Sequence, residues 1–120
     1  MKVLVFEDSY DIGVLLESQG IKLNRMDFRQ HWNSQNAVEV IASFQPDVLL
    51  LDHYMPPNTG LEVLKALNVA IQSNDIERPS LIVAMSSDDR KNAMMMREGA
   101  DVTISKFEVP FLSVFRDYSS

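Results

Sequence analysis

The sequence predicts an α/β fold built on one five-stranded parallel sheet. Short apolar runs recur along the 120 residues, at positions 3–6, 48–51 and 81–85, and a weaker run lies at positions 102–105. Longer amphipathic stretches separate these runs, without repeats, low-complexity tracts or linkers. Uninterrupted apolar runs are typical of strands covered on both faces, and strands that alternate with helices are typical of a parallel sheet.

The amino-terminal quarter supplies two strands with a helix between them. Residues 3–6, Val-Leu-Val-Phe, form a buried strand. Residues 11–19 carry apolar side chains at helical spacing, and Gly20 follows as the usual carboxyl-terminal cap. Residues 26–32 alternate between apolar and polar side chains, which predicts a strand at an edge of the sheet.

A helix, a central strand and another helix come next. Asn33 and Ser34 are both suitable amino-terminal caps for the first of these helices, and Pro46 stops it. Residues 48–51, Val-Leu-Leu-Leu, form the third strand. After a proline-rich turn, apolar residues recur at helical spacing from Leu61 onward, which predicts the third helix.

The last third of the chain completes the pattern. Residues 81–85 form the fourth strand, and residues 89–98 form a helix that closes at Gly99. Residues 102–105 form the fifth strand. A fifth helix is expected to open around Pro110, because proline is favoured in the first turn of a helix.

The order of the strands follows from the alternation. Parallel strands joined by helices cross over with a right-handed connection, and five such units form a doubly wound sheet. The flavodoxin-like arrangement has strand order 2-1-3-4-5, with helices on both faces. Ligands of such sheets bind beyond the carboxyl ends of the strands, where the winding reverses. We therefore expect a site between the first and third strands, just after Phe6 and Leu51.

Composition and charge limit the class of protein. With 46% hydrophobic residues, the chain is expected to form one domain over residues 1–120. The formal net charge of −6 argues against binding nucleic acid or an anionic membrane, so proteins are the expected partners. The chain has no cysteine, and the short apolar run before Glu7 is too short for a signal peptide or a membrane span. These features predict a cytoplasmic protein.

Three carboxylates, Glu7, Asp8 and Asp52, follow the first strand and the third strand. The predicted fold gathers them at one edge of the sheet, where each pair would repel by roughly a few kcal/mol at an effective dielectric of about 20. A cation is required to offset this repulsion. Mg²⁺ fits best, because it binds one or two carboxylates and keeps water and phosphate oxygens as its other ligands.

Ser86 and Lys106 are expected at the same edge, because they follow the fourth and fifth strands. An aspartate with an ordinary pKa of about 4 is ionised at neutral pH and can attack phosphorus without a general base. Phosphoryl transfer then depends on positioning and on charge cancellation, which a metal, a lysine and a hydroxyl supply. The sequence therefore predicts that Asp52 is a nucleophile that accepts a phosphoryl group.

This ordered set of residues resembles the receiver domain of two-component response regulators, over essentially the whole chain. The matching features are the acid pair Glu7-Asp8, the pattern D-x-x-M-P-x-x-x-G from Asp52 to Gly60, Ser86, and Lys106 after the run Gly99-Ala100-Asp101. Each feature is weak alone, but the ordered set is highly specific. The resemblance implies a single receiver domain that acts in phosphorelay signal transduction.

The resemblance also implies partners and residue roles. A histidine kinase or a phosphotransfer protein would phosphorylate Asp52, with Lys106 and Ser86 contacting the phosphoryl oxygens. Mg²⁺ would be bound by Glu7, Asp8, Asp52 and the backbone carbonyl of Tyr54. No enzymatic activity is expected beyond Mg²⁺-dependent self-phosphorylation and dephosphorylation of Asp52. The signal would pass through the fourth helix, the fifth strand and the fifth helix, to a downstream protein, a fused effector domain or a second copy in a homodimer.

Two positions depart from the family pattern and keep an alternative open. Receivers usually carry a proline after the lysine, often in a cis bond, where this chain has Phe107. They usually carry an aromatic switch residue in the fifth strand, where this chain has Thr103. The alternative is a receiver-like interaction module that does not use phosphate. A flavodoxin-like or nucleotide-binding enzyme is disfavoured, because the turn "EDSYDIG" lacks a glycine-rich phosphate cradle.

Overall fold

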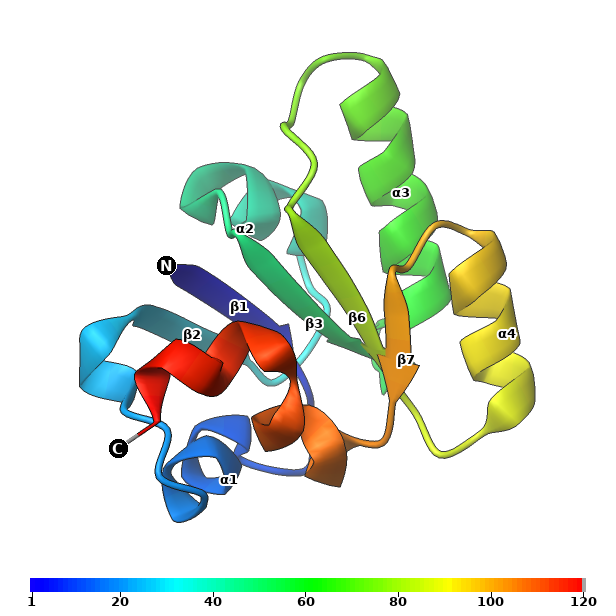
Figure 1. Cartoon of the computed structure of the whole chain (residues 1–120). Helices are drawn as coiled ribbons and strands as arrows, with labels where there is room; N and C mark the ends of the chain where they lie inside the picture. The colour runs from blue at the N-terminus through cyan, green and yellow to red at the C-terminus, as the bar shows by residue number, and fades with distance from the viewer. Residues whose placement is uncertain (120) are drawn as a thin grey trace.

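A five-stranded parallel sheet forms the centre of the molecule (Figure 1). The structure is a computed structural model and describes residues 1–119. The strands of the sheet are β1 (Lys2–Phe6), β2 (Asp27–His31), β3 (Val48–Asp52), β6 (Leu81–Met85) and β7 (Val102–Ile104). They lie in the order β2-β1-β3-β6-β7, which confirms the predicted flavodoxin-like sheet.

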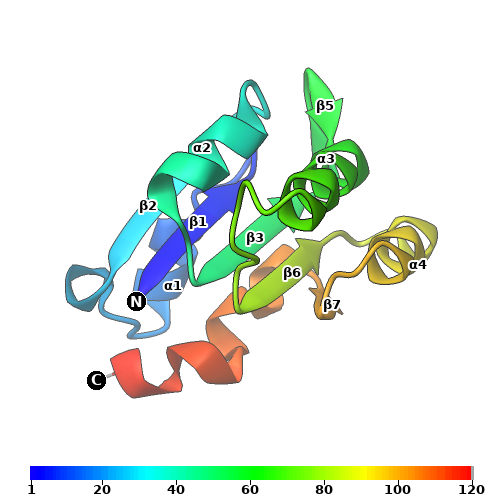
Figure 2. The same ribbon diagram turned by 90° about the horizontal axis from the view of Figure 1, so that it is seen from above.

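Helices cover both faces of this sheet (Figure 2). The α-helices are α1 (Ile12–Ser18), α2 (Ala37–Phe44), α3 (Gly60–Gln72) and α4 (Asp89–Arg97). Helices α2, α3 and α4 pack on one face, whereas α1 and the carboxyl-terminal segment pack on the other. Across residues 1–119, no helix is both long and apolar enough to span a membrane.

The strands supply two cores, because successive side chains of a strand point to opposite faces of a sheet. In β1, Leu4 and Phe6 join the core under α2 and α3, while Val3 and Val5 join the core under α1. Every residue of β3 is buried, which fits its position in the middle of the sheet. The last residue of β3 is Asp52, so the sheet holds this carboxylate at the end of its most buried strand.

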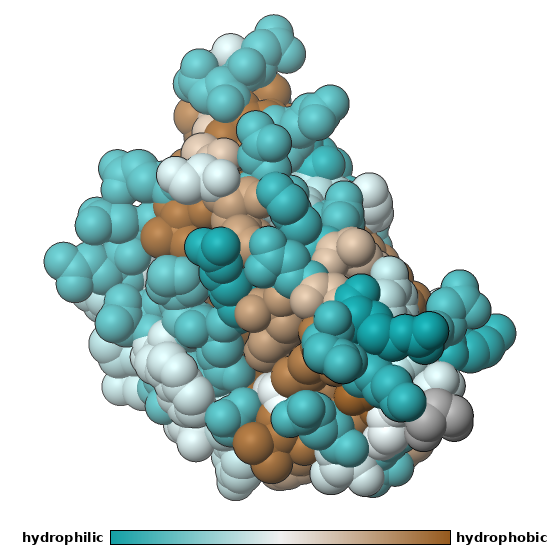
Figure 3. All heavy atoms as spheres, turned by 90° about the vertical axis from the view of Figure 1, so that its left-hand side faces the viewer, coloured by the Kyte–Doolittle hydropathy of each residue, from teal (hydrophilic) through white to brown (hydrophobic). Residues whose placement is uncertain are grey.

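Strand β2 lies at the edge of the sheet, as its alternating sequence predicts. Its residues are exposed or partly buried, unlike those of β3. Figure 3 looks onto the side of the molecule that carries β2, and hydrophilic residues cover most of that face. Such a surface protects a free strand edge from pairing with another chain.

The predicted fifth α-helix is wrong. The chain forms two 3₁₀ segments instead, η2 (Lys106–Phe111) and η3 (Ser113–Tyr118), separated by Leu112 in an extended conformation. Four core-facing residues recur every third position, namely Val109, Leu112, Phe115 and Tyr118, and Val114 packs beside them. A period of three matches the three residues per turn of a 3₁₀ helix, rather than the 3.6 of an α-helix.

The predicted cap of the second helix is also wrong. Helix α2 begins after Asn36, which has a left-handed backbone conformation and makes no side-chain cap hydrogen bond. The Asn33 side chain accepts a hydrogen bond from the Gln35 backbone, within the turn that precedes the helix. Ser34 is completely buried and bonds to a different part of the chain, described below. A tertiary contact therefore uses the hydroxyl that the local sequence offers as a cap.

Candidate functional site

The three predicted carboxylates meet at the carboxyl edge of the sheet. Glu7 and Asp8 directly follow β1, Asp52 ends β3, and the two strands are neighbours with Phe6 paired to Leu51. One oxygen of each carboxylate lies within 4.8 Å of the others. The fold thus gathers negative charge from two separated parts of the sequence, at the point where the winding of the sheet reverses.

Lys106 brings a positive charge to this cluster. It is the first residue of η2, and its Nζ lies 2.7 Å from Glu7 Oε1 and 3.9 Å from Asp52 Oδ2. The Lys106–Phe107 peptide bond is trans, since the one cis bond among residues 1–119 joins Pro56 to Pro57. The lysine therefore reaches the acidic site without a cis bond after it.

Glu7 is fully buried and fully hydrogen-bonded. Its Oε2 accepts from the backbone N–H groups of Ser9, at 2.5 Å, and Tyr10, at 3.0 Å, and its Oε1 accepts from Lys106. Burial alone would raise the pKa of Glu7, but these hydrogen bonds outweigh it and hold the pKa below its ordinary value. Glu7 is therefore an ionised anchor whose two oxygens are already engaged.

Asp52 behaves differently, although it lies beside Glu7. The residue is only 8% exposed, and burial together with the negative charge of Glu7 raises the pKa of Asp52 to about 7. Lys106 and the His53 backbone N–H, which donates to Oδ1 at 2.8 Å, offset only part of this shift. The expectation of an ordinary pKa for Asp52 is therefore wrong for the metal-free site, and an added cation would favour the ionised form.

The donor set of the site fits a hard divalent cation. Carboxylate oxygens are the ligands that Mg²⁺ prefers, and the cluster has three carboxyl groups against one lysine. Asp8 is partly exposed, and its Oδ1 accepts from the Ser9 hydroxyl at 3.0 Å, so its second oxygen is free to bind a metal. The open donors are thus on Asp8 and Asp52, while Glu7 is held by protein hydrogen bonds.

Tyr54 lies in the loop that follows Asp52. It belongs to β4 (Tyr54–Met55), which pairs with β5 (Asn58–Thr59) in a short hairpin, and its side chain is exposed. Gly60 ends this loop at a close approach, because a Cβ at position 60 would lie 2.2 Å from the Asp52 carbonyl oxygen. Only glycine fits between Asp52 and the first turn of α3, which explains the glycine of the sequence pattern.

Ser86 lies at the same edge, directly after β6. Its neighbour Met85 pairs with Asp52, so Ser86 follows the strand beside the acidic cluster. Its hydroxyl accepts a hydrogen bond from the Asp88 backbone N–H at 3.0 Å, and its own N–H donates to the Ile104 carbonyl. The structure therefore brings Ser86 to the edge, with its hydroxyl engaged within its own loop.

Sequence reasoning missed the role of Ser34. Its hydroxyl bonds to the Met55 carbonyl and, at 3.1 Å, to the Asn58 carbonyl, and it accepts from the Asn58 backbone N–H at 2.7 Å. This buried serine ties the loop after β2 to the hairpin that follows Asp52. Nothing in the local sequence distinguishes it from a helix cap.

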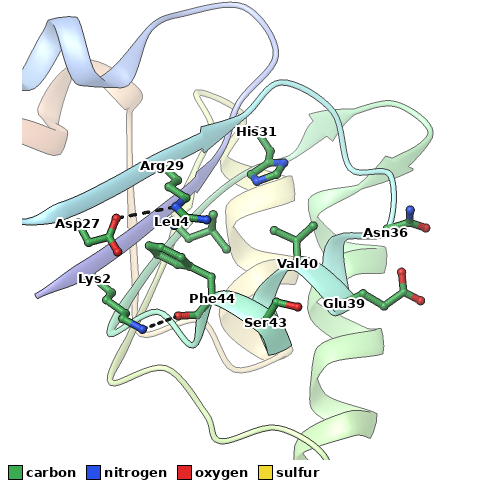
Figure 4. A pocket seen from close by; sticks show the side chains of 10 residues that line it. All are labelled: Lys2, Leu4, Asp27, Arg29, His31, Asn36, Glu39, Val40, Ser43 and Phe44. Carbon is green, nitrogen blue, oxygen red and sulfur yellow. Dashed lines mark hydrogen bonds and ion pairs between the residues drawn. The ribbon is translucent and has the colours of Figure 1, made fainter.

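A separate pocket lies between β2 and α2 (Figure 4). It has a volume of about 490 Å³, and none of the predicted site residues line it. Its cations are already engaged, since Lys2 donates to the Phe44 carbonyl and Arg29 lies over the Phe44 ring at 4.7 Å, beside Asp27. We therefore assign the functional site to the acidic edge and not to this pocket.

Comparison with known proteins agrees with this geometry. The chain matches the response regulator receiver domain over residues 3–110. It is 34% identical over 68 residues to sporulation initiation phosphotransferase F of Bacillus subtilis, covering 57% of this chain and 54% of the relative. It is 28% identical over 110 residues to the cell cycle transcriptional regulator CtrA of Caulobacter vibrioides, covering 88% of this chain and 44% of the relative. The matched stretch thus spans about half the length of these relatives, or less.

Solved structures show the same fold. The receiver domain of Ssk1 of Saccharomyces cerevisiae, in complex with the phosphotransfer protein Ypd1, matches with a TM-score of 0.74 at 20% identity, over 98% of this chain and 87% of that chain. The response regulator domain of CheB of Thermotoga maritima matches with a TM-score of 0.67 at 22% identity, over 98% and 95% of the two chains. With the family match over residues 3–110, these comparisons show that this chain belongs to the response regulator receiver domain family of two-component signalling.

Proposed function

We propose that this receiver domain is a phosphoacceptor switch that is phosphorylated on Asp52. The observation that carries the proposal is the arrangement around this carboxylate. Asp52 lies within 4.8 Å of the carboxylates of Glu7 and Asp8, and 3.9 Å from the Lys106 ammonium. This arrangement places a nucleophile beside one ammonium and beside carboxylates that would hold a divalent cation, the positive charges that phosphoryl transfer requires.

In the proposed reaction, an Asp52 carboxylate oxygen forms a bond to phosphorus as the bond from phosphorus to the leaving group of the donor breaks. The leaving group departs with the electron pair and takes a proton from solvent, and Asp52 becomes an acyl phosphate. In this proposal Lys106 offsets negative charge on the phosphoryl oxygens. The Ser86 hydroxyl can donate to one of them, because its oxygen accepts from Asp88 and its own hydrogen is not used in that bond. Asp52 must be ionised to attack, so a cation near it raises the reactive fraction at neutral pH.

The metal in this proposal is Mg²⁺. Asp8, Asp52 and the Tyr54 backbone carbonyl would bind it directly, and Glu7 would act through its charge or through a bound water, because both Glu7 oxygens accept protein hydrogen bonds. When bound, Mg²⁺ would neutralise charge on the acid cluster and on the incoming phosphoryl group. We propose no enzymatic activity beyond Mg²⁺-dependent self-phosphorylation and dephosphorylation.

A histidine kinase or a phosphotransfer protein is the proposed donor. Support comes from similarity to the receiver domain of Ssk1, which was solved in complex with a histidine phosphotransfer protein. A cytoplasmic location is proposed from the family match over residues 3–110. Because the chain spans about half the length of its curated relatives, a downstream protein, a fused effector domain and a homodimer all remain proposals for the output.

The proposed output surface consists of α4, β7 and the two 3₁₀ segments. Ser86 precedes α4 and bonds to β7, so a change at its hydroxyl would reach both elements. Met94 and Met96 are exposed on α4 at 36% and 46%, and flexible thioether side chains are well suited to contact a partner. The surface lacks a fifth α-helix, which distinguishes its shape from the expected one.

The test is phosphorylation of the purified chain by a small phosphodonor with Mg²⁺, followed by mass spectrometry. We expect addition of one phosphoryl group to the wild type and none to Asp52→Asn. An unmodified wild type, with no change in Trp32 fluorescence or stability on Mg²⁺ titration, would favour the alternative of a phosphate-independent interaction module, which Thr103 and Phe107 suggest. Asp75→Asn, at an exposed position outside the site, serves as the matched control.

A further inference from the structure

Two ion pairs of unequal length hold the Lys106 ammonium. Its side chain is 19% exposed, and a lysine ammonium is a point charge on a flexible four-carbon stem. The nearer carboxylate, Glu7, holds it at 2.7 Å, while Asp52, the group it would serve in the proposed reaction, is 3.9 Å away. Its direction toward Asp52 therefore depends on what else contacts the side chain.

The ring of Tyr10 provides such a contact. Lys106 Nζ lies 4.8 Å from the centroid of this ring, within the range of a cation–π interaction. The backbone of Tyr10 is fixed on both sides, since its N–H donates to Glu7 Oε2 at 3.0 Å and its carbonyl accepts from Gln30 Nε2 at 2.8 Å. Tyr10 thus presents its ring from a well-anchored position beside the acid pair.

Phe107 packs against the Tyr10 ring. The centroids of Tyr10 and Phe107 are 5.2 Å apart with an interplanar angle of 79°, an edge-to-face arrangement that aromatic pairs prefer. Phe107 directly follows Lys106 in η2, so one turn of chain supplies both the cation and the second ring. Both rings are about half exposed, at 47% and 54%. The Tyr10 ring contacts both the lysine ammonium and the Phe107 ring, so Phe107 acts on the lysine through Tyr10.

We propose that Tyr10 and Phe107 are positioning residues that form an aromatic clamp and hold the Lys106 ammonium over the acidic site. The clamp limits the lysine to directions that keep it near Glu7 and Asp52. It also explains how the lysine is placed when Phe107, and not a proline, follows it. The inference deepens the proposed function, because a fixed Lys106 would receive the phosphoryl oxygens, but its geometry can be tested without phosphorylation.

The first test measures the geometry by NMR. The ring current of an aromatic side chain shifts the NMR signals of protons over its face upfield. The side-chain signals of Lys106 should therefore lie upfield in the wild type. They are assigned by their loss in Lys106→Met. We expect Tyr10→Leu to abolish the displacement, Tyr10→Phe to retain it and Phe107→Leu to reduce it. Phe111→Leu, an exposed aromatic of the same 3₁₀ segment, is the matched control and should change nothing.

The second test measures phosphorylation by a small phosphodonor with Mg²⁺. We expect Tyr10→Leu to lower the rate about two- to fivefold, the size of effect that a partly exposed cation–π contact supports, and Tyr10→Phe to restore it. Lys106 signals that are the same in the wild type and Tyr10→Leu would overturn the clamp, as would equal loss of rate in Tyr10→Phe and Tyr10→Leu. If the wild type accepts no phosphoryl group while the signals shift as expected, the clamp stands and the proposed function fails. If Tyr10→Leu does not fold, Phe107→Leu tests the clamp through the contact between Phe107 and Tyr10, and Lys106 signals unchanged in that variant would overturn it.

Discussion

Lys106 and Glu7 are joined by an ion pair 2.7 Å long, although 99 positions separate them in the sequence. The contact ties the start of the carboxyl-terminal segment to the end of β1, at the edge where Asp52 lies. Its geometry gives Glu7 a role distinct from that of the other two acids. Glu7 fixes the lysine, whereas Asp8 and Asp52 retain oxygens for other ligands.

Removing the charge of Glu7 should therefore destabilise the protein. We expect Glu7→Gln to lower the free energy of unfolding by about 2–4 kcal/mol, because it leaves a partly buried ammonium without its closest counter-charge. Urea denaturation measures this change, with exposed Glu77→Gln as the control. Equal stability of Glu7→Gln and the control would show that the ion pair does not hold the site together.

The stability of the metal-free protein should depend on the protonation of Asp52. Its pKa is raised by folding from 3.8 to about 7, so the folded state binds the proton more tightly than the unfolded state. Stability is then greatest below the unfolded pKa and falls as the pH rises toward the folded pKa. Between pH 4 and pH 8 we expect the group to contribute a loss of roughly 2–4 kcal/mol, measured by urea denaturation in a chelator.

Asp52→Asn should remove this loss, because an amide does not ionise. At pH 8 the variant should be more stable than the wild type when no metal is present, and the two should converge near pH 4. Asp75→Asn, at an exposed position, should keep the wild-type pH profile. A variant that loses stability with pH as steeply as the wild type would assign the effect to another group.

Mg²⁺ should make the wild type more stable than Asp52→Asn, the reverse of their order without metal. A ligand that binds only the folded state stabilises it by about 2.7 kcal/mol at a hundred times its dissociation constant. We expect thermal unfolding of the wild type to shift upward with Mg²⁺, and Asp8→Asn to show little shift, because Asp8 has a free oxygen and Glu7 has none. An undiminished Mg²⁺ shift in Asp8→Asn would place the ion elsewhere.

Ser34→Ala should loosen the hairpin that follows Asp52. The substitution leaves the buried Met55 carbonyl and the partly buried backbone groups of Asn58 without their partner, which costs about 1–3 kcal/mol. Hydrogen exchange of the Asn58 amide should increase, whereas exposed Ser43→Ala should leave both stability and exchange unchanged. If Asn58 keeps its protection in Ser34→Ala, another group holds the hairpin in place.

Some elements of this fold can be predicted from the sequence because their pattern permits few other structures. The runs at residues 3–6 and 81–85 form β1 and β6. An uninterrupted apolar run is typical of a strand that is buried on both faces of a sheet. On α4, one methionine of three is buried, Met95 at 1% exposure, which confirms that three successive residues cannot face one core. The carboxylate cluster followed from topology alone, since parallel strands end at the same edge.

The missed features depend on contacts between distant segments. The Tyr10 ring meets Phe107 only because η2 packs beside α1, and no local pattern encodes that contact. The raised pKa of Asp52 likewise depends on the depth of burial and on the charge of Glu7, neither of which can be read from residue types. In the carboxyl-terminal segment, the spacing of three residues from Val109 through Leu112 and Phe115 to Tyr118 is the sequence signal that indicates 3₁₀ turns.

The 3₁₀ segment that begins at Lys106 has a mechanical consequence. Hydrogen bonds in 3₁₀ helices have poorer geometry than those in α-helices, so these turns unwind and rewind with less loss of backbone energy. Lys106, whose ammonium lies beside Glu7 and Asp52, is therefore attached to a stretch of backbone with weaker hydrogen bonds than the sheet. If Asp52 is phosphorylated as proposed, a displacement of this ammonium would be taken up by the 3₁₀ turns more readily than by the sheet.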